Sequence, residues 1–283
     1  MKRLKVSEGI SDAALAILEE ANIFQCDDGP FDIEWVRVKP PTSDAPVICS
    51  PTTGRTHLAG ISEKPKIKKI MSSPTQDAVN SWKVDVLFER PRKVYTLSDI
   101  DQELLQSIRS TSEVAIGLLI SIMRFQASRE HNRPGERIQG KTFACTHLGR
   151  VGSHIVEAMQ AMGSRWCQDE IWDCCPDILF VTSRYEGQPL ITQNYLSILK
   201  DGVYIVNVAR SELVDRDAIT AAMRSGKVAG YAEDVTDDRG VGWIEYHSRN
   251  WNIVGTKHLG GFARESLEEV ETALAKVVVD DLV

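Results

Sequence analysis

Apolar residues recur along the chain in two patterns, short continuous runs and longer stretches with helical spacing. From residue 142 onward the two patterns alternate. The continuous run 142–146 is followed by apolar residues at helical spacing, which continue as far as Gly163. The same alternation predicts strands at 177–182, 203–207, 230–235 and 253–256, with helices at 192–199 and 215–223. Since these runs show no polar alternation, they predict a parallel sheet that helices cover on both faces.

The first hundred residues predict a smaller α/β unit with many loops. Ser11 is the expected N-cap of a helix over 13–21. Short strands are expected at 4–6, 31–38, 47–49, 67–71, 84–88 and 94–97, and helices at 99–108, 112–125 and 264–282. The helix 112–125 is apolar around most of its surface, which indicates burial between domains or subunits.

Charge and composition argue against several classes of function. The net charge is −7, and the basic residues do not gather on one predicted face, so nucleic acid is not an expected partner. The longest apolar run, near residues 114–123, is too short to span a bilayer. Residues 1–6 lead straight into the first helix without a secretory signal pattern, so a cytoplasmic protein is expected.

The cysteines carry no metal-binding pattern. None of the six has metal-ligand spacing, and two of them are adjacent: Cys26, Cys49, Cys145, Cys167, Cys174 and Cys175. We therefore expect no metal site and reduced thiols.

A glycine-containing turn joins the strand 142–146 to its helix. It reads His147-Leu148-Gly149-Arg150-Val151-Gly152, and the pattern G-x-G-x-x-G would place its first glycine at His147. In a dinucleotide site, the N–H groups of such a turn and the positive end of the helix dipole receive a pyrophosphate. The alternative is an ordinary strand-to-helix turn in which the two glycines serve the backbone.

Three later segments follow successive predicted strands. They are 207–215, with the sequence NVARSELVD, 230–235, with GYAEDV, and 257–261, with KHLGG. Ligands of open α/β sheets bind outside the carboxyl ends of the strands, so Arg210, Asp234 and His258 are expected to converge near the glycine turn.

This ordered set resembles the D-isomer-specific 2-hydroxyacid dehydrogenase family, which includes phosphoglycerate dehydrogenases and glyoxylate or hydroxypyruvate reductases. The family's order is N-x-A-R-G-x-x-V-D, then G-x-x-x-D-V, then P-H-x-G-G, and the match covers about residues 95–282. The resemblance implies a shortened Rossmann-type doubly wound parallel sheet plus a smaller flavodoxin-like α/β substrate domain. The implied dinucleotide-binding domain is 99–263, and the implied substrate domain is 1–98 completed by 264–283.

The resemblance also implies an activity, hydride transfer between NAD or NADP and a small D-2-hydroxy or 2-oxo acid. Arg210 would hold the carboxylate and polarise the carbonyl, and His258 would exchange the proton. The residues implied for cofactor binding are Gly149, Arg150, Val151, Gly152, Ala209, Asp234 and Gly260. A homodimer through the helix 112–125 is implied as well.

The chain departs from the family pattern in its cofactor and catalytic segments. The position of the family's catalytic glutamate is Arg239, and a cation there would lower the proton affinity of the histidine. His147 replaces the first glycine, and some twenty or more residues are missing after Gly163, so Asp169 or Glu170 stands where a ribose residue or a later helix is expected. The alternative hypothesis is a catalytically impaired member that binds nucleotide or dimerises in a regulatory or structural role.

Overall fold

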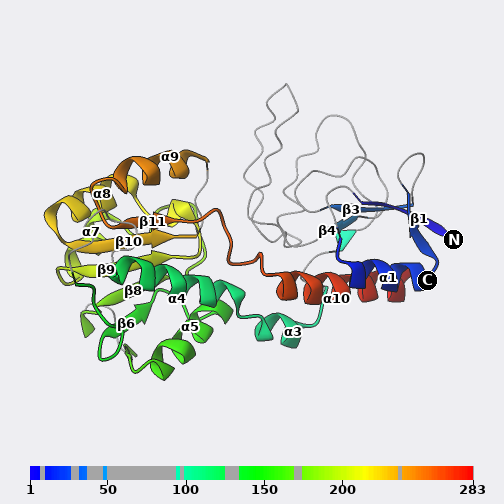
Figure 1. Ribbon diagram of the computed structural model, residues 1–283, viewed down its shortest axis with the longest axis horizontal. Helices are drawn as coiled ribbons and strands as arrows, with labels where there is room; N and C mark the ends of the chain where they lie inside the picture. Colours follow the sequence, from blue (N-terminus) through cyan, green and yellow to red (C-terminus); the bar gives the residue numbers. More distant parts are fainter. Residues whose placement is uncertain are drawn as a thin grey trace. The chain divides into compact units, whose positions relative to one another are not determined.

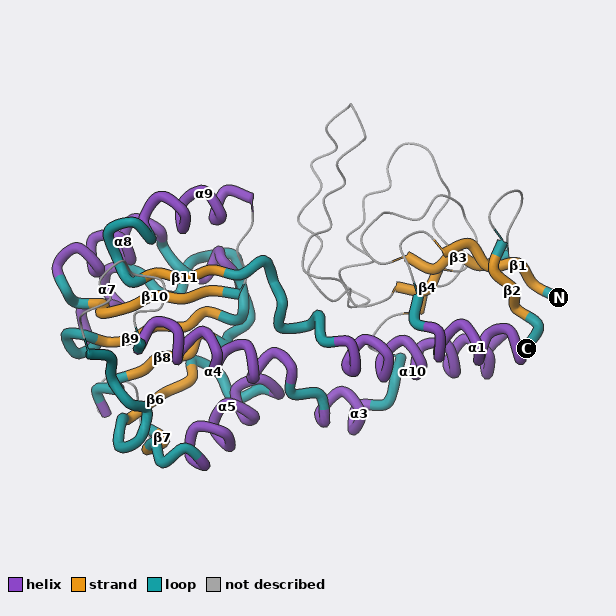
Figure 2. Tube along the Cα trace, viewed as in Figure 1, coloured by secondary structure: helices purple, strands orange, loops and turns teal. Residues whose placement is uncertain are grey.

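The computed structural model describes residues 1–6, 10–26, 32–36, 47–49, 94–95, 99–124, 134–168, 174–234 and 238–282. The chain divides into two compact units, Met1–Ile108 with Gly261–Val283 as unit 1 and Arg109–Gly260 as unit 2 (Figures 1 and 2). We expected boundaries after residues 98 and 263, and the structure has them after residues 108 and 260. The roles of the units in binding substrate and dinucleotide stay predictions. Within the described residues, no helix is long and apolar enough to cross a lipid bilayer.

Unit 1 is built on a five-stranded parallel sheet. Its strands are β1 (Lys2–Val6), β2 (Ile23–Gln25), β3 (Ile33–Val36), β4 (Val47–Cys49) and β5 (Val94–Tyr95). Their order, β2-β1-β3-β4-β5, is that of the flavodoxin-like fold, as expected. Strand β2 was not predicted by the sequence analysis. The expected strands at 67–71 and 84–88 lie outside the described residues.

Three described helices belong to unit 1, namely α1 (Asp12–Glu20), α3 (Gln102–Ser107) and α10 (Arg264–Leu282). Ser11 caps α1 as predicted, its side chain accepting from the N–H of Ala14. Helices α1 and α10 pack side by side (Figure 1), and their apolar faces share one core with the sheet. The buried centre of this core is formed by Leu4, Leu18, Ile33, Trp35, Leu274 and Val278.

Unit 2 is built on a six-stranded parallel sheet with the order β11-β10-β9-β8-β6-β7. The strands are β6 (Thr142–Cys145), β7 (Arg165–Trp166), β8 (Ile178–Val181), β9 (Val203–Asn207), β10 (Val228–Glu233) and β11 (Ile253–Gly255). The helices are α4 (Ser110–Met123), α5 (Arg150–Ala161), α7 (Gln193–Ile198), α8 (Arg216–Ser225) and α9 (Asp238–His247), with a 3₁₀ turn at Ser211–Leu213. Helices α4 and α5 cover one face of the sheet, and α7 and α8 cover the other (Figure 1). The predicted doubly wound parallel sheet is confirmed.

Burial on both faces explains why the strands of unit 2 are continuously apolar. In β6, the side chains of Phe143 and Cys145 enter the cluster beneath α4 and α5, and the side chain of Ala144 enters the cluster beneath α7 and α8. Strands β8 and β9 are buried at every residue. A polar side chain in these strands loses its water and is tolerated only with hydrogen-bond partners, as at Asn207 at the end of β9.

Packing within unit 2 accounts for most of the apolar surface of α4. Leu118, Leu119 and Ile122 are buried against the sheet and α5. Ile120 is 37% exposed on the opposite side of the helix, and Gly117 is exposed beside it. The homodimer expected through this helix stays a prediction.

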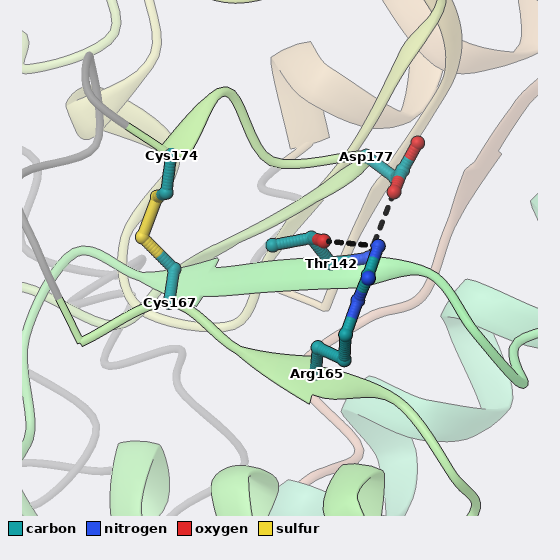
Figure 3. Close-up of a disulfide and its surroundings, with 5 residues drawn as sticks. All are labelled: Thr142, Arg165, Cys167, Cys174 and Asp177. Carbon is teal, nitrogen blue, oxygen red and sulfur yellow. Dashed lines mark hydrogen bonds between the residues drawn. A yellow bond between two sulfur atoms is a disulfide. The ribbon is translucent and has the colours of Figure 1, made fainter.

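The expectation of reduced thiols is wrong for two of the six cysteines. Cys167, just after β7, and Cys174, just before β8, form a disulfide (Figure 3). Cys167 is buried, and both residues pack in the cluster beneath α7 and α8. Spacing alone could not predict this pairing, because seven residues separate the partners and the fold brings them together.

Loss of this disulfide should destabilise the protein by about 2–3 kcal/mol, from the loop entropy of the short ring that it closes. Urea unfolding of Cys167→Ser against the oxidised wild type measures the difference. Cys175→Ser is the matched control, since Cys175 is exposed and in no disulfide, and it should change the unfolding free energy by less than about 0.5 kcal/mol. Equal stability of Cys167→Ser and the wild type would contradict the expected role.

Candidate active site

All the site residues expected from the sequence lie in unit 2, at or just beyond the carboxyl ends of its strands. The glycine turn follows β6, Arg210 follows β9, Asp234 follows β10, and His258 follows β11. Because these strands are parallel and adjacent in one sheet, their carboxyl ends share one edge. The structure therefore brings the predicted segments to the same edge, as the sequence analysis expected.

The glycine turn is closely packed at Gly152. A Cβ atom added there would lie 2.2 Å from the carbonyl oxygen of His147, far inside contact distance. Glycine thus lets the first turn of α5 approach the end of β6, which is the role of the last glycine of a dinucleotide turn. Gly149 is the N-cap of α5, and no side chain caps this helix.

His147 is accommodated without backbone strain. Its φ angle lies outside the left-handed region, so this position does not require glycine for conformational reasons. The hydroxyl of Thr182 donates to the carbonyl of His147 (2.7 Å) and accepts from its N–H (3.1 Å). The imidazole lies against Gly149, where an added Cβ would be 3.2 Å from His147 Cδ2. The side chain that replaces the first glycine therefore packs against the second glycine of the turn, Gly149.

Arg150 and Val151 form the first turn of α5. Burial lowers the pKa of the Arg150 guanidinium below its ordinary value. A cation at a helix N-terminus is also disfavoured by the helix dipole. Val151 is half-buried and packs against the cluster beneath α4 and α5.

The loop after β9 is held by Asn207, which is fully buried. Its side-chain NH₂ donates to the carbonyl of Arg210 (2.7 Å), and its Oδ1 accepts from the N–H of Ala209 (3.0 Å). Arg210 also donates from Nη1 to the carbonyl of Ala209 (2.6 Å). Burial lowers the pKa of the Arg210 guanidinium, while the charge of Glu212 raises it. These hydrogen bonds fix the backbone position of Arg210. The carbonyl of Ala209 accepts from one guanidinium N–H, and a guanidinium has five such donors in all.

Asp234 is 1% exposed and accepts three hydrogen bonds from the loop after β11. Its Oδ1 accepts from the hydroxyl of Thr256 and the N–H of Leu259, both at 2.6 Å, and its Oδ2 accepts from the N–H of Gly260 at 2.7 Å. Burial raises the pKa of the Asp234 carboxyl, and these hydrogen bonds offset part of the shift. Gly260 is needed here, because an added Cβ would lie 2.7 Å from Asp234 Oδ2.

The sequence analysis missed a buried charged cluster beside Asp234. Glu233 is fully buried and accepts from Arg216 (2.7 Å) and from the hydroxyl of Tyr231 (2.6 Å). The Arg216 guanidinium also lies over the ring of Trp243 in α9, 4.4 Å from its centroid. Burial and the charge of Glu233 hold the pKa of Tyr231 well above its ordinary value. A signal was available, namely a carboxylate one residue before Asp234 in an otherwise apolar strand.

Some expected features fall partly outside the described residues. Arg239 lies in the first turn of α9, where the structure describes the backbone but not the side chain of Arg239. Asp169 and Glu170, the candidate ribose residues, lie outside the description. Among the described residues, no group of His, Cys, Asp and Glu could hold a metal ion.

The fold defines the class, a two-unit α/β protein with a Rossmann-type parallel sheet in unit 2. Residues 177–260 match the family model described as D-isomer specific 2-hydroxyacid dehydrogenase, NAD binding domain. This part of unit 2 is similar to that family, and the matched residues include Arg210, Asp234 and His258.

Known proteins similar to the chain agree with this assignment. D-3-phosphoglycerate dehydrogenase 2 of Saccharomyces cerevisiae is 26% identical over 215 residues, which are 60% of this chain and 46% of the yeast protein. The human D-3-phosphoglycerate dehydrogenase is 27% identical over 170 residues, 52% of this chain and 31% of that protein. The chain thus spans less than half the length of these relatives. An NAD⁺-bound 3-phosphoglycerate dehydrogenase structure from Entamoeba histolytica shares the fold, with a TM-score of 0.65, 15% identity and coverage of 99% of this chain and 94% of that one.

Proposed function

We propose that the protein is an NAD-linked oxidoreductase that transfers a hydride between the nicotinamide and a small D-2-hydroxy or 2-oxo acid. The observation that carries the proposal is the placement of Arg210 and His258 at the carboxyl edge of one parallel sheet, each on a loop fixed by a buried polar side chain. The family match covers both residues.

The turn after β6 has the chemistry to receive the pyrophosphate of NAD. Its helix carries no side-chain cap, so the N–H groups at the helix start have no side-chain acceptor at the N-cap. The half-buried cation of Arg150 at the same helix start would be offset by an anion. Gly152 lets the helix start approach the strand, as a bound pyrophosphate requires.

Bound NADH would supply the hydride, and the residues of the chain would hold the substrate and manage the proton. The planar guanidinium of Arg210 suits bidentate pairing with the substrate carboxylate and polarises the neighbouring carbonyl. Its fixed loop limits the entropy lost when substrate binds. The imidazole of His258 would donate the proton that the developing alkoxide needs, and would take it back in the reverse reaction.

The second candidate is a catalytically impaired member that retains the fold for nucleotide binding or dimerisation. Arg239 favours it, because in the sequence a cation stands at the position of the family's catalytic glutamate. We also propose a homodimer through the exposed side of α4, supported by Gly117 and Ile120 on that side. Size-exclusion chromatography measures the oligomeric state. A cytoplasmic location, the remaining expectation from the sequence, is likewise a proposal.

Fluorescence titration with NADH, followed by an oxidation assay on small 2-oxo acids, separates the two candidates. The substrate panel is glyoxylate, pyruvate, hydroxypyruvate and 3-phosphohydroxypyruvate. Saturable binding below about 1 mM with turnover of at least one acid supports the enzyme. Binding without turnover of any acid favours the impaired member, and the absence of binding at about 1 mM contradicts both nucleotide-dependent functions.

A further inference from the structure

His258 lies in a backbone conformation that its residue type rarely adopts. Its φ angle is +61°, in the left-handed region. For a residue with a Cβ atom this conformation costs about 1 kcal/mol or more, and such strain persists only where the surrounding structure holds it. The hydrogen bonds that hold the loop after β11 should therefore lie close to His258 on both sides.

Asp234 supplies these hydrogen bonds. Thr256, two residues before His258, donates its hydroxyl to Asp234 Oδ1, and the N–H groups of Leu259 and Gly260 donate to the two carboxylate oxygens just after it. Thr256 is itself tied to β10, because its N–H donates to the carbonyl of Glu233 (2.9 Å). The carboxylate thus bridges the loop across His258.

The same hydrogen bonds leave Asp234 little capacity for a ligand. The residue is 1% exposed, and both of its oxygens already accept from the loop. The Cβ that Gly260 lacks would lie 2.7 Å from Oδ2, so the loop backbone covers the carboxylate closely. A nicotinamide carboxamide could reach the remaining acceptor site of Asp234 only if this backbone moved away.

We propose that Asp234 is a positioning residue that holds His258 in its left-handed conformation and thereby sets the direction of the imidazole, rather than a ligand of the nicotinamide. The role of His258 as proton donor rests on the proposed function. The mechanical part, a carboxylate that maintains a strained loop, does not depend on it.

Amide hydrogen exchange at Leu259 and Gly260 tests the mechanical part without cofactor. His258→Gly and His258→Ala both remove the imidazole, but only glycine removes the cost of the left-handed backbone. Protection of the two amides should be about five-fold higher in His258→Gly than in His258→Ala. Equal protection in the two variants would show that the loop is not under strain and would overturn the proposal.

Substitutions of Thr256 change the hydrogen bonding of the Asp234 carboxylate and leave the carboxylate in place. Thr256→Val removes one donor to Asp234 and should lower the protection of Leu259 and Gly260 about ten-fold, whereas Thr256→Ser keeps the hydroxyl and should restore it. Unchanged protection in Thr256→Val would count against the role of Asp234.

The effect of Asp234 on catalysis through His258 is tested by measuring NADH binding and turnover separately. In Thr256→Val, kcat should fall about ten-fold with an NADH Kd within about two-fold of the wild type, and Thr256→Ser should restore kcat. A weakened Kd with unchanged kcat would instead assign Asp234 to the nicotinamide. If the wild type binds no NADH, the proposed function fails, and the exchange experiments still decide whether Asp234 holds the loop.

Discussion

Arg210→Ala should lower kcat/KM for the preferred 2-oxo acid about a hundred-fold to a thousand-fold, the usual loss when a preorganised charge-stabilising donor is removed from an active site. The NADH Kd should stay within about two-fold, because the proposed partner of the guanidinium is the substrate. Steady-state kinetics and fluorescence titration measure the two quantities on the same preparation.

Two further arginine variants make this result specific. Arg210→Lys keeps the charge but loses the planar pair of donors, so its kcat/KM should lie between those of the wild type and Arg210→Ala. Arg224→Ala is the matched control, since Arg224 lies in the last turn of α8, is exposed and contacts the ring of Trp251. An equal loss of activity in Arg210→Ala and Arg224→Ala, or full activity in Arg210→Ala, would contradict the role of Arg210.

Gly152→Ala should destabilise the protein by about 3 kcal/mol, at the upper end of overpacking costs. The added Cβ would meet a backbone carbonyl at 2.2 Å, and that carbonyl is fixed by the Thr182 hydroxyl, so no flexible side chain can move aside. Urea unfolding measures the loss. NADH binding should weaken in parallel, because the start of α5 must move away from β6.

Gly117→Ala is the natural control, because it makes the same substitution inside a neighbouring helix. A Cβ at Gly117 meets no atom within 4 Å, so alanine should raise the free energy of unfolding by about 0.5–1 kcal/mol through its better helix propensity. The two substitutions should therefore have opposite signs. A stabilising effect of Gly152→Ala would show that α5 does not pack on the turn as described.

The sequence predicted the five strands β6, β8, β9, β10 and β11 of unit 2 because their signals are local and repeated, but it did not predict the two-residue strand β7 or helix α9. Continuous apolar strands and intervening amphipathic helices dictate a covered parallel sheet, and parallel pairing then places every strand's carboxyl end at one edge. Arg210 and His258 could be placed at that edge for the same reason. The helix predicted at 215–223 is α8, which ends at Ser225 with Gly226 as its C-cap at φ +79°.

The remaining features depend on tertiary contacts that local sequence signals do not carry. The Cys167–Cys174 disulfide depends on the two cysteines meeting in the cluster beneath α7 and α8. The hydrogen bonds of Asp234 depend on a loop more than twenty residues away, so composition and motif could not distinguish a loop anchor from a nicotinamide ligand. The positive φ at His258 could not be predicted from the residue type, because a histidine adopts extended and helical backbone more often than the left-handed region.

The discontinuity of unit 1 has a consequence for synthesis. Its first helix is joined to its last by a hydrogen bond from the N–H of Ser11 to the buried carboxylate of Glu271 (2.7 Å), so the two meet only after the whole of unit 2 has been translated. Unit 2 is one continuous segment and can fold as soon as it leaves the ribosome. The growing chain therefore carries the strands of unit 1 with an uncovered apolar surface until α10 emerges. During that interval we expect chaperones to bind the exposed apolar surface of the nascent chain.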